Sequence, residues 1–367
     1  MTRLKILRKT PAQLGYTFPP EWHPHAGTWF SWPRPEGISF PGKYHTVPEN
    51  LARIIREIQS REQVHINVPN ANYEWIVRQT LKEFSPHGAR NVFFHHIKTN
   101  ESWCRDHGPA FVVKARRVAK PQAARRSAAA NRVAVVDWGF NAWGGKYPPY
   151  EDDDQVPTRV AEELKVPVFY PGVVMEGGAV DFNGRGTVMT TESCLLNKNR
   201  NPKLSKKRIE QYLKDFYGQK HVIWLGDGIA GDDTDGHIDD LARFISPTKI
   251  ASVVEEDPRD ENYKVLRENL RRLEGLRDQD GRAFEIIKMP MPRAVVHDGQ
   301  RLPASYANFY FVNGACLVPT YRDRNDRRAV RILQENLPKH EVIGIDCVEL
   351  IWGLGAIHCL TQQQPRV

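Results

Sequence analysis

One type of stretch occurs five times along the chain, and this recurrence limits the folds that the chain can adopt. Each copy opens with polar or glycine-rich residues and continues into an apolar run of strand length. Successive copies start about 60 to 80 residues apart. A unit of this size, with strands and a helix, predicts α/β modules around a shared centre on which the polar entries converge. The copies are HPHAGTWFSWP (23–33), SWCRDHGPAFVV (102–113), EGGAVDFNGRGTVMTTES (176–193), TDGHIDDLARFISP (234–247) and ASYANFYFVNGACLVP (304–319).

The alternative arrangement is a doubly wound parallel sheet. That fold would need a glycine-rich phosphate-binding turn after a strand, as GxGxxG or GxxxxGK[ST], and neither motif occurs in such a place. The NGRGT stretch at 183–187 is typical of a hairpin turn instead. Apolar residues at three- and four-residue spacings predict helices at 50–60, 73–84, 159–165, 208–216, 263–276 and 328–337.

The composition of the 367-residue chain is that of a soluble globular protein, with 40% hydrophobic residues. No run of 18 apolar residues predicts a membrane span, and the N-terminal residues lack the apolar core of a signal peptide. The five cysteines are an odd number without a CxxC pair, which argues against a disulfide framework and a zinc ribbon. We therefore expect a cytoplasmic protein in a reducing compartment.

The formal charge of +8 is concentrated in one insert, residues 114–132, which reads KARRVAKPQAARRSAAANR. This insert holds seven Lys and Arg residues and no acid, so the rest of the chain has a net charge of +1. Its low complexity predicts a surface loop between two strands. Contact with RNA or an anionic surface is an open alternative, although the insert has no aromatic residues for stacking. We expect no nucleic acid and no membrane partner.

Chemically capable side chains stand beside glycines in three of these entries and in the C-terminal stretch GLGAIHC, residues 353–359. They are Asp106, Glu176, His237, Asp239 and Cys359. If residues 237–244 form a strand, His237 and Asp239 face the same side. Each residue also has a structural interpretation, such as an ion pair with Arg105 for Asp106, a turn cap for Glu176 and a buried core thiol for Cys359.

Metal binding is a weaker interpretation of the same residues. The acidic GDGIAGDDTDG run, residues 226–236, lacks the twelfth-position glutamate and the flanking helices of an EF-hand. A cavity with several acids and one thiol is also unusual for zinc. A thiol, an imidazole and several carboxylates would instead suit a planar cation such as a guanidinium, whose N–H groups match carboxylates and whose carbon can be attacked by sulfur.

Seven motifs carry a family resemblance from about residue 16 to 365. They are EWHPHAGTWFSWP, ESWCRDHGPAFVV, FNAWGGKYPP, EGGAVDFNGRGTVMTTESCLLN, DTDGHIDDLARF, ASYANFYFVNGACLVPTY and GAIHCLTQQQP. In this order they resemble the agmatine deiminase family, also described as bacterial peptidylarginine-deiminase-like. The resemblance implies a pentein fold, which is a five-module α/β propeller with pseudo-fivefold symmetry, and a single catalytic domain over residues 1–367.

The resemblance also implies roles for individual residues. Cys359 matches the nucleophile, His237 the general acid/base, and Asp239 the carboxylate that grips the guanidinium. Asp106 and Glu176 match further substrate carboxylates, Asn308 a polar residue near the cysteine, and Trp103 a wall of the pocket. The implied reaction converts agmatine to N-carbamoylputrescine and ammonia through a covalent thiouronium, with no metal or organic cofactor. The implied context is polyamine and arginine metabolism, and the protein could form homo-oligomers.

The sequence departs from the family pattern next to the nucleophile. The usual GGGNIHC reads GLGAIHC here, with Leu354 and Ala356 as the changed residues, and FNAWGG is followed by KYPPYEDDDQVP. Other guanidines, free arginine and peptidyl arginine are alternative substrates. Amidino transfer to an amine on the same fold is an alternative reaction, and a non-catalytic binding protein is an alternative class.

Overall fold

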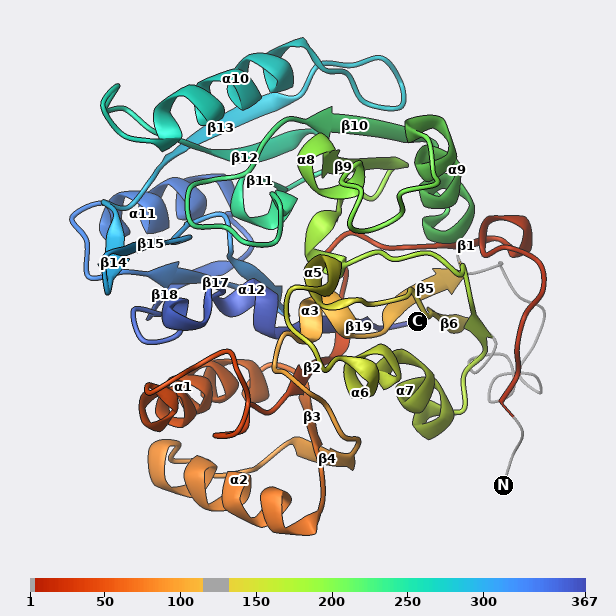
Figure 1. Cartoon of the computed structure of the whole chain (residues 1–367), viewed down its shortest axis with the longest axis vertical. Helices are drawn as coiled ribbons and strands as arrows, with labels where there is room; N and C mark the ends of the chain where they lie inside the picture. Colours follow the sequence, from red (N-terminus) through yellow and green to blue (C-terminus); the bar gives the residue numbers. More distant parts are fainter. Residues whose placement is uncertain (1–3, 115–131) are drawn as a thin grey trace.

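Five small sheets share one connection pattern in the computed structural model, which describes residues 4–114 and 132–367. In each sheet a strand pairs antiparallel with one neighbour and parallel with another, and one or more helices lie between the two parallel strands in the chain. The sheets lie around a central region that contains the short helices α3 (Cys104–His107), α5 (Ala142–Gly145) and α12 (Ile357–Leu360) (Figure 1). The polar entry at 102–113 reaches this central region through α3.

The first two sheets are four-stranded. One has the order β19-β2-β3-β4, formed by Gln362–Pro365, His25–Ser31, Gln63–Val68 and Val92–His96, with α1 (Val47–Gln59) and α2 (Ala71–Phe84). The other has the order β1-β5-β6-β7, formed by Tyr16–Thr17, Ala110–Lys114, Val133–Val136 and Val168–Phe169, with α5 (Ala142–Gly145), α6 (Glu151–Asp154) and α7 (Val156–Leu164).

The other three sheets are three-stranded. One consists of β8 (Asp181–Phe182), β9 (Thr187–Thr191) and β10 (His221–Leu225), with α8 (Glu192–Leu195) and α9 (Lys206–Tyr217). The next consists of β11 (Ala242–Phe244), β12 (Lys249–Val254) and β13 (Glu285–Pro290), with α10 (Asn262–Gly275). The last consists of β16 (Tyr310–Val312), β17 (Ala315–Thr320) and β18 (Glu341–Asp346), with α11 (Asp326–Asn336). A separate hairpin joins β14 (Val295–His297) to β15 (Gln300–Leu302).

Short helical turns complete the described chain. They are η1 (Ala12–Leu14), η2 (Tyr44–Thr46), α3 (Cys104–His107), η4 (Gly177–Ala179), η5 (Ile238–Asp240), η6 (Ile351–Gly353) and α12 (Ile357–Leu360). Three of them, α3, η4 and η5, come just before strands β5, β8 and β11, and α12 comes just before the C-terminal strand β19. These turns and the residues beside them carry polar side chains.

Local sequence explains the long helices. The side chain of Asn70 accepts hydrogen bonds from the N–H groups of Asn72 and Tyr73 and so caps α2, and Ser205 caps α9 through the N–H of Arg208. The apolar face of α1 is buried at Leu51, Ile54, Ile55 and Ile58 in the largest core cluster. All six helices expected from the apolar spacing are present, with bounds shifted by a few residues. The helices lie on the outside of their sheets (Figure 1).

Two strand predictions have different outcomes. The hairpin at NGRGT is confirmed, because β8 and β9 pair antiparallel with Phe182 opposite Val188. The strand over 237–244 is wrong for its first half, since only Ala242–Phe244 is extended and residues 238–240 form the 3-10 turn η5. The cause is local: the N–H of His237 donates to Thr234 Oγ1 at 3.1 Å and to Asp232 Oδ2 at 3.2 Å, which folds the chain into turns before β11.

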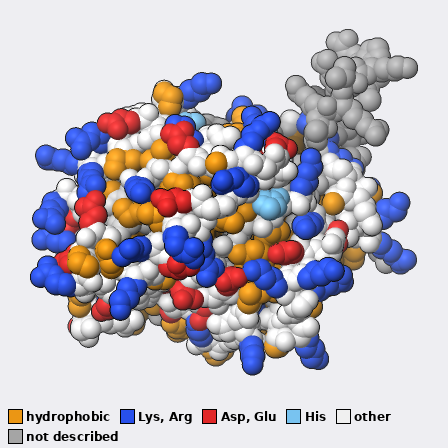
Figure 2. All heavy atoms as spheres, turned by 90° about the horizontal axis from the view of Figure 1, so that it is seen from above, with side chains coloured by type: hydrophobic (Ala, Val, Ile, Leu, Met, Phe, Trp, Pro, Cys, Tyr) orange, Lys and Arg blue, Asp and Glu red, His pale blue; other side chains and the backbone are white. Residues whose placement is uncertain are grey.

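Surface charge and the basic insert bear on the expected partners. Residues 115–131 of the insert lie outside the described residues, and the flanking strands β5 and β6 pair with Val113 opposite Val133. On the face in Figure 2, acidic and basic side chains are intermixed. Among the described residues, no helix has the length and apolar character needed to cross a membrane.

Candidate active site

The central region is built from the short turns, which pack against one another. Helix α12 contacts α3, α3 contacts η4, and η4 contacts η5. These turns and the residues beside them carry Cys359, Asp106, Glu176, His237 and Asp239, all of them buried. The structure therefore brings together residues that are as much as 253 positions apart in the sequence (Asp106 and Cys359).

The Cys359 thiol is held by an amide and faces carboxylates. The Nδ2 group of Asn308 donates to Sγ at 3.1 Å, and Asp239 Oδ2 lies 3.7 Å from Sγ. Asn308 Oδ1 also accepts the main-chain N–H groups of His358 at 3.0 Å and Cys359 at 3.4 Å, so this one side chain fixes the start of α12. Burial, together with Asp239, Asp240 and Asp106, raises the pKa of Cys359 well above its ordinary value. Without a compensating cation the sulfur is a thiol at neutral pH.

Asp106 and His237 meet beside a glycine of the EGG motif. Asp106 Oδ1 accepts the N–H of Gly178 at 3.0 Å and lies 3.7 Å from His237 Nδ1, while Oδ2 accepts from Trp143 Nε1 at 3.0 Å. A Cβ atom on Gly178 would lie 2.6 Å from His237 Nδ1, 2.8 Å from Asp106 Oδ1 and 3.1 Å from Asp239 Oδ2. Gly178 is therefore required for the two carboxylates and the imidazole to converge.

The charges of this pair are set by burial and by each other. Burial raises the pKa of Asp106 to about 6, with further upward contributions from Asp239 and Glu176. Burial lowers the pKa of His237, but Asp106, Cys194 and Asp239 together raise it well above its ordinary value. Because both ring nitrogens of His237 lack a hydrogen-bond partner among the described residues, the imidazolium is free to donate to a molecule in the site.

Asp239 has one engaged and one free oxygen. Its Oδ2 accepts from His358 Nδ1 at 2.6 Å, and its Oδ1 has no hydrogen-bond partner within the described part of the chain although the residue is fully buried. Burial raises the pKa of Asp239, but the hydrogen bond and charge of His358 lower it below its ordinary value. An ionised carboxylate oxygen beside the thiol is thus available for a cation.

Glu176 differs from the other carboxylates because it already forms an ion pair with a buried arginine, Arg200. Its Oε1 accepts from Arg200 Nε at 2.6 Å, and both side chains are fully buried. Ligand atoms of Glu176, Cys194 and His237 lie within 4.8 Å of one another, which is a conceivable metal cluster. However, the Arg200 guanidinium next to Glu176 adds a positive charge that opposes a metal cation there.

The cavity that reaches Cys359 has a volume of about 350 Å³. Trp103 forms one wall, as the sequence predicted, and its Nε1 donates to Ser39 Oγ at 2.8 Å. A Cβ on Gly355 would lie 2.5 Å from the Trp103 ring, so the indole packs directly on the main chain before the nucleophile. Trp143 and Trp352 also line the cavity, and acidic residues of its lining include Asp106, Asp233 and Asp298.

Comparisons with known proteins place the chain in a family. The family model of Porphyromonas-type peptidyl-arginine deiminases matches residues 17–365. Agmatine deiminase of Pseudomonas syringae pv. tomato is 37% identical, with 99% of each chain covered, and that of Medicago truncatula is 35% identical, with 98% of this chain and 99% of the other covered.

This chain belongs to the agmatine deiminase family.

Solved structures of family members show the same fold. The agmatine deiminase of Enterococcus faecalis, described as catalysing its reaction, has a TM-score of 0.88 at 32% identity and covers 99% of this chain and 100% of its own. A C. jejuni agmatine deiminase variant with substrate bound has a TM-score of 0.84 at 31% identity over 96% of both chains. The pentein-like α/β fold that the resemblance implied is therefore the fold of this chain.

The two departures from the agmatine deiminase motif can now be placed. Leu354 has a left-handed backbone with φ of 68°, a conformation that favours the glycine usual in the family. Its side chain lines the cavity. Ala356 precedes α12 and provides no side-chain cap, and the capping contact to the N–H of His358 comes from Asn308 instead.

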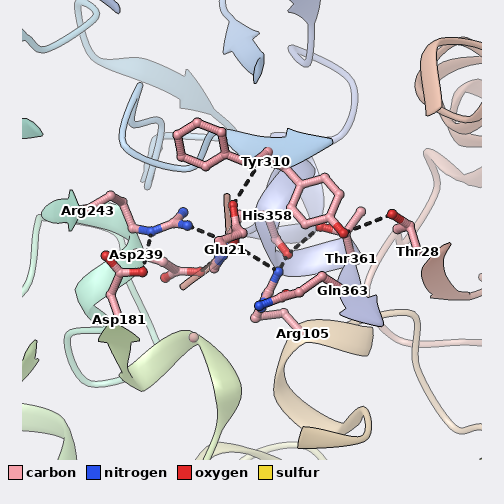
Figure 3. A network of polar contacts seen from close by, with 12 residues as sticks. Glu21, Thr28, Arg105, Asp181, Asp239, Arg243, Tyr310, His358, Thr361 and Gln363 are labelled. Atoms are coloured by element: carbon pink, nitrogen blue, oxygen red, sulfur yellow. Dashed lines mark hydrogen bonds and ion pairs between the residues drawn. The ribbon is translucent and has the colours of Figure 1, made fainter. Parts of the chain in front are cut away.

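A group of charged residues behind the site was not predicted. Glu21 Oε2 lies 2.7 Å from His358 Nε2, 2.9 Å from Arg243 Nη2 and 3.3 Å from Arg105 Nη2 (Figure 3). Arg243 Nε also lies 3.2 Å from Asp181 Oδ1. Each of these residues lies in one of the seven motifs that carry the family resemblance. The motifs therefore contain these residues, but only the fold shows that they contact one another. We call Glu21, Arg105, Asp181, Asp239, Arg243 and His358 the Glu21 cluster.

Proposed function

We propose that the protein deiminates a guanidino substrate, with agmatine as that substrate and N-carbamoylputrescine and ammonia as products. The observation that carries the proposal is the position of the Cys359 thiol between Asp239 and the other carboxyl groups that raise its pKa. A guanidinium held there satisfies Asp239 Oδ1 and Asp106 with its N–H groups and places its carbon at the sulfur. Relatives named agmatine deiminase support the same reaction.

The proposed first step is addition of sulfur to the guanidinium carbon. The bound cation lowers the pKa of Cys359, so the thiol releases its proton to solvent only when the substrate is in place. His237, as an imidazolium, then donates a proton to the departing ammonia, and a thiouronium remains on Cys359. Holding the two reacting atoms together can contribute roughly 7–11 kcal/mol of the barrier reduction.

The proposed second step is hydrolysis of the thiouronium. His237 is now neutral and accepts a proton from a water molecule, whose oxygen adds to the same carbon. The C–S bond breaks, the ureido product leaves, and Cys359 and the imidazolium are restored. Glu176, which Arg200 already pairs, acts through the charge that it presents to His237 more than as a direct clamp.

The outer part of the cavity favours an amine tail on the substrate. Among the described residues that line it, none is Lys or Arg, whereas Asp233 and Asp298 are present. Tyr147 donates its hydroxyl to Asp233 Oδ2 and so holds this carboxylate at the cavity wall. An anionic rim suits the second ammonium of agmatine and opposes the carboxylate of free arginine.

Further features of the protein belong to the same proposal. The five sheets form a five-module propeller with pseudo-fivefold symmetry, and residues 1–367 form one catalytic domain. The five cysteines are all free, which fits a reducing cytoplasm, where the reaction would serve polyamine and arginine metabolism. A homo-oligomer is compatible with this role.

The test is a panel of guanidines. Agmatine, arginine and blocked arginyl peptides are each incubated with the protein, and ammonia and ureido product are measured. We expect turnover of agmatine and loss of all turnover in Cys359→Ser. Cys316→Ser, in β17, is the matched control and should retain activity, because Cys316 is buried outside the cavity lining. Full activity of Cys359→Ser would reject the nucleophile, and preference for arginine or peptides would reject agmatine.

A further inference from the structure

His358 stands between two carboxylates of the Glu21 cluster. Its Nδ1 lies 2.6 Å from Asp239 Oδ2, and its Nε2 lies 2.7 Å from Glu21 Oε2 (Figure 3). Both distances are those of charge-assisted hydrogen bonds, and the ring is buried. His358 directly precedes Cys359 in the chain, and both of its ring nitrogens are occupied by carboxylates, so neither is left for a molecule in the site.

The geometry fixes the protonation of this ring. An ionised carboxylate oxygen can only accept a hydrogen bond, so a nitrogen that faces it at this distance must carry the proton. A neutral imidazole has one N–H and could satisfy Asp239 or Glu21 but not both. Bonds to both carboxylates therefore require the imidazolium, with one positive charge between two negative ones.

The surrounding charges support this arrangement. Burial raises the pKa of Glu21, but Arg243, His358 and Arg105 lower it far below its ordinary value, so Glu21 is ionised. Asp239 is likewise ionised, as described above. In the described part of the chain, the other charged or titratable groups around His358 and its two partners are His25, Arg105, Asp106, Asp181, His237, Asp240, Arg243, Tyr310, Cys316 and Cys359.

We propose that His358 is a positioning residue whose imidazolium keeps Asp239 ionised and turns its Oδ1 toward the substrate cation. This inference rests on the proposed function, because it assigns Asp239 to guanidinium binding. His358 itself does not touch the substrate. It occupies Oδ2, and the free oxygen is thereby left for the guanidinium.

Loss of the ring has a defined consequence for Asp239. The carboxylate would remain buried beside Asp106, Asp240 and Cys359, and burial and the neighbouring carboxylates favour its protonated form. The charges of His237 and Arg243, which also lower its pKa, would stay, but the hydrogen bond and the charge of His358, which lower it most, would be lost. A protonated Asp239 cannot hold a guanidinium by charge. The effect should therefore grow as the pH falls, which a simple loss of folded protein at fixed pH would not produce.

The first experiment compares pH profiles of kcat/KM for agmatine. In His358→Gln, the acid limb of this profile is expected to move to a pH about one unit higher. Relative to the wild type, kcat/KM should therefore fall about tenfold more at the acid end than on the plateau. His358→Asn places an N–H near the position of Nδ1 without the charge, and it should also shift the limb, although less. His65→Gln is the control, since His65 is a buried histidine that bonds His95 and no residue of the site. An unshifted limb in both His358 variants would overturn the proposal.

The second experiment does not depend on turnover. Histidine-selective ¹⁵N labelling reports whether each ring nitrogen is protonated, and His358→Gln identifies the signal. We expect both nitrogens of His358 to carry protons at pH 7, because each of them faces an ionised carboxylate. A neutral tautomer at pH 7 would overturn the inference even if agmatine is the substrate. Protonated nitrogens in a protein that turns over no guanidine would instead reject the proposed function and leave the geometry standing.

Discussion

The Cys359 thiol lies in surroundings that oppose its ionisation. Most activated cysteines have a cationic neighbour that lowers the pKa, whereas burial and three aspartates raise the pKa here. In the proposed reaction, the cation that compensates them is the substrate itself. The free protein should therefore be protected from neutral electrophiles and oxidants at physiological pH.

Two alkylating agents of similar shape test this property. Chloroacetamidine carries an amidinium, and chloroacetamide is its neutral counterpart. At pH 7 the ratio of their rates of inactivation should exceed the ratio for glutathione by at least about tenfold, the factor that corresponds to one pKa unit. The amidinium lowers the pKa of Cys359 on binding, and the amide does not. Equal ratios for the protein and glutathione would contradict substrate-assisted ionisation.

At the same scale, the sequence singled out the residues that we propose to react, but not the residues that surround them. Cys359, His237 and Asp106 stand in glycine-rich motifs and could be singled out. Glu21 could not, because its role follows from a contact with His358, 337 positions away. Long-range ion pairs inside a buried centre leave no periodicity in a single sequence.

At the scale of elements, local patterns predicted the helices, whose apolar faces repeat every three or four residues. The interpretation of residues 237–244 as a strand failed at residues 237–240, where the side chains of Asp232 and Thr234 accept the N–H of His237 and hold the chain in turns. His237 and Asp239 nevertheless reach one site, because η5 turns both of them toward Gly178. His237 and Asp239 thus lie near the same point, but a 3-10 turn and not a strand brings them there.

Arg200 links two of these turns. It bonds Glu176 before η4 and donates from Nη2 to the main-chain carbonyl of Thr234 at 2.8 Å, in the turn before His237. Arg200→Met should cost about 3–5 kcal/mol of unfolding free energy in urea titrations, because Glu176 is left buried and unpaired.

A second substitution separates charge from packing at this pair. Adding Glu176→Gln to Arg200→Met should restore much of the lost stability, since no buried charge then remains. Arg78→Met breaks an exposed pair with Glu74 on α2 and should cost less than about 1 kcal/mol. If Arg200→Met were as mild as this control, the buried pair would not hold the turns together.

At the scale of the whole molecule, the buried carboxyl groups make stability depend on pH. The pKa of Asp106 is about 6 in the folded protein and 3.8 as an ordinary value. Between these values the folded state binds more protons than the unfolded state, so stability falls as the pH rises from about 4 to 6. The carboxylate that the proposed reaction needs is thus one that folding disfavours.

Asp106→Asn should remove this dependence. The decrease in unfolding free energy between pH 4 and pH 7 should be smaller than in the wild type by about 2–3 kcal/mol, which corresponds to a shift of two pKa units. Urea titrations at both pH values measure it. Asp257→Asn is the control, because Asp257 is exposed and its pKa is lowered to about 2, outside this range. An unchanged difference in Asp106→Asn would show that Asp106 is ionised throughout.

The walls of the cavity provide an optical signal. Three of the nine tryptophans, Trp103, Trp143 and Trp352, line the space in front of the thiol. A guanidinium that enters lies within reach of their indole faces, which attract cations and whose emission depends on their surroundings. We therefore expect intrinsic fluorescence to report occupancy of the site, without a label, in the Cys359→Ser protein, which should bind the substrate without turning it over.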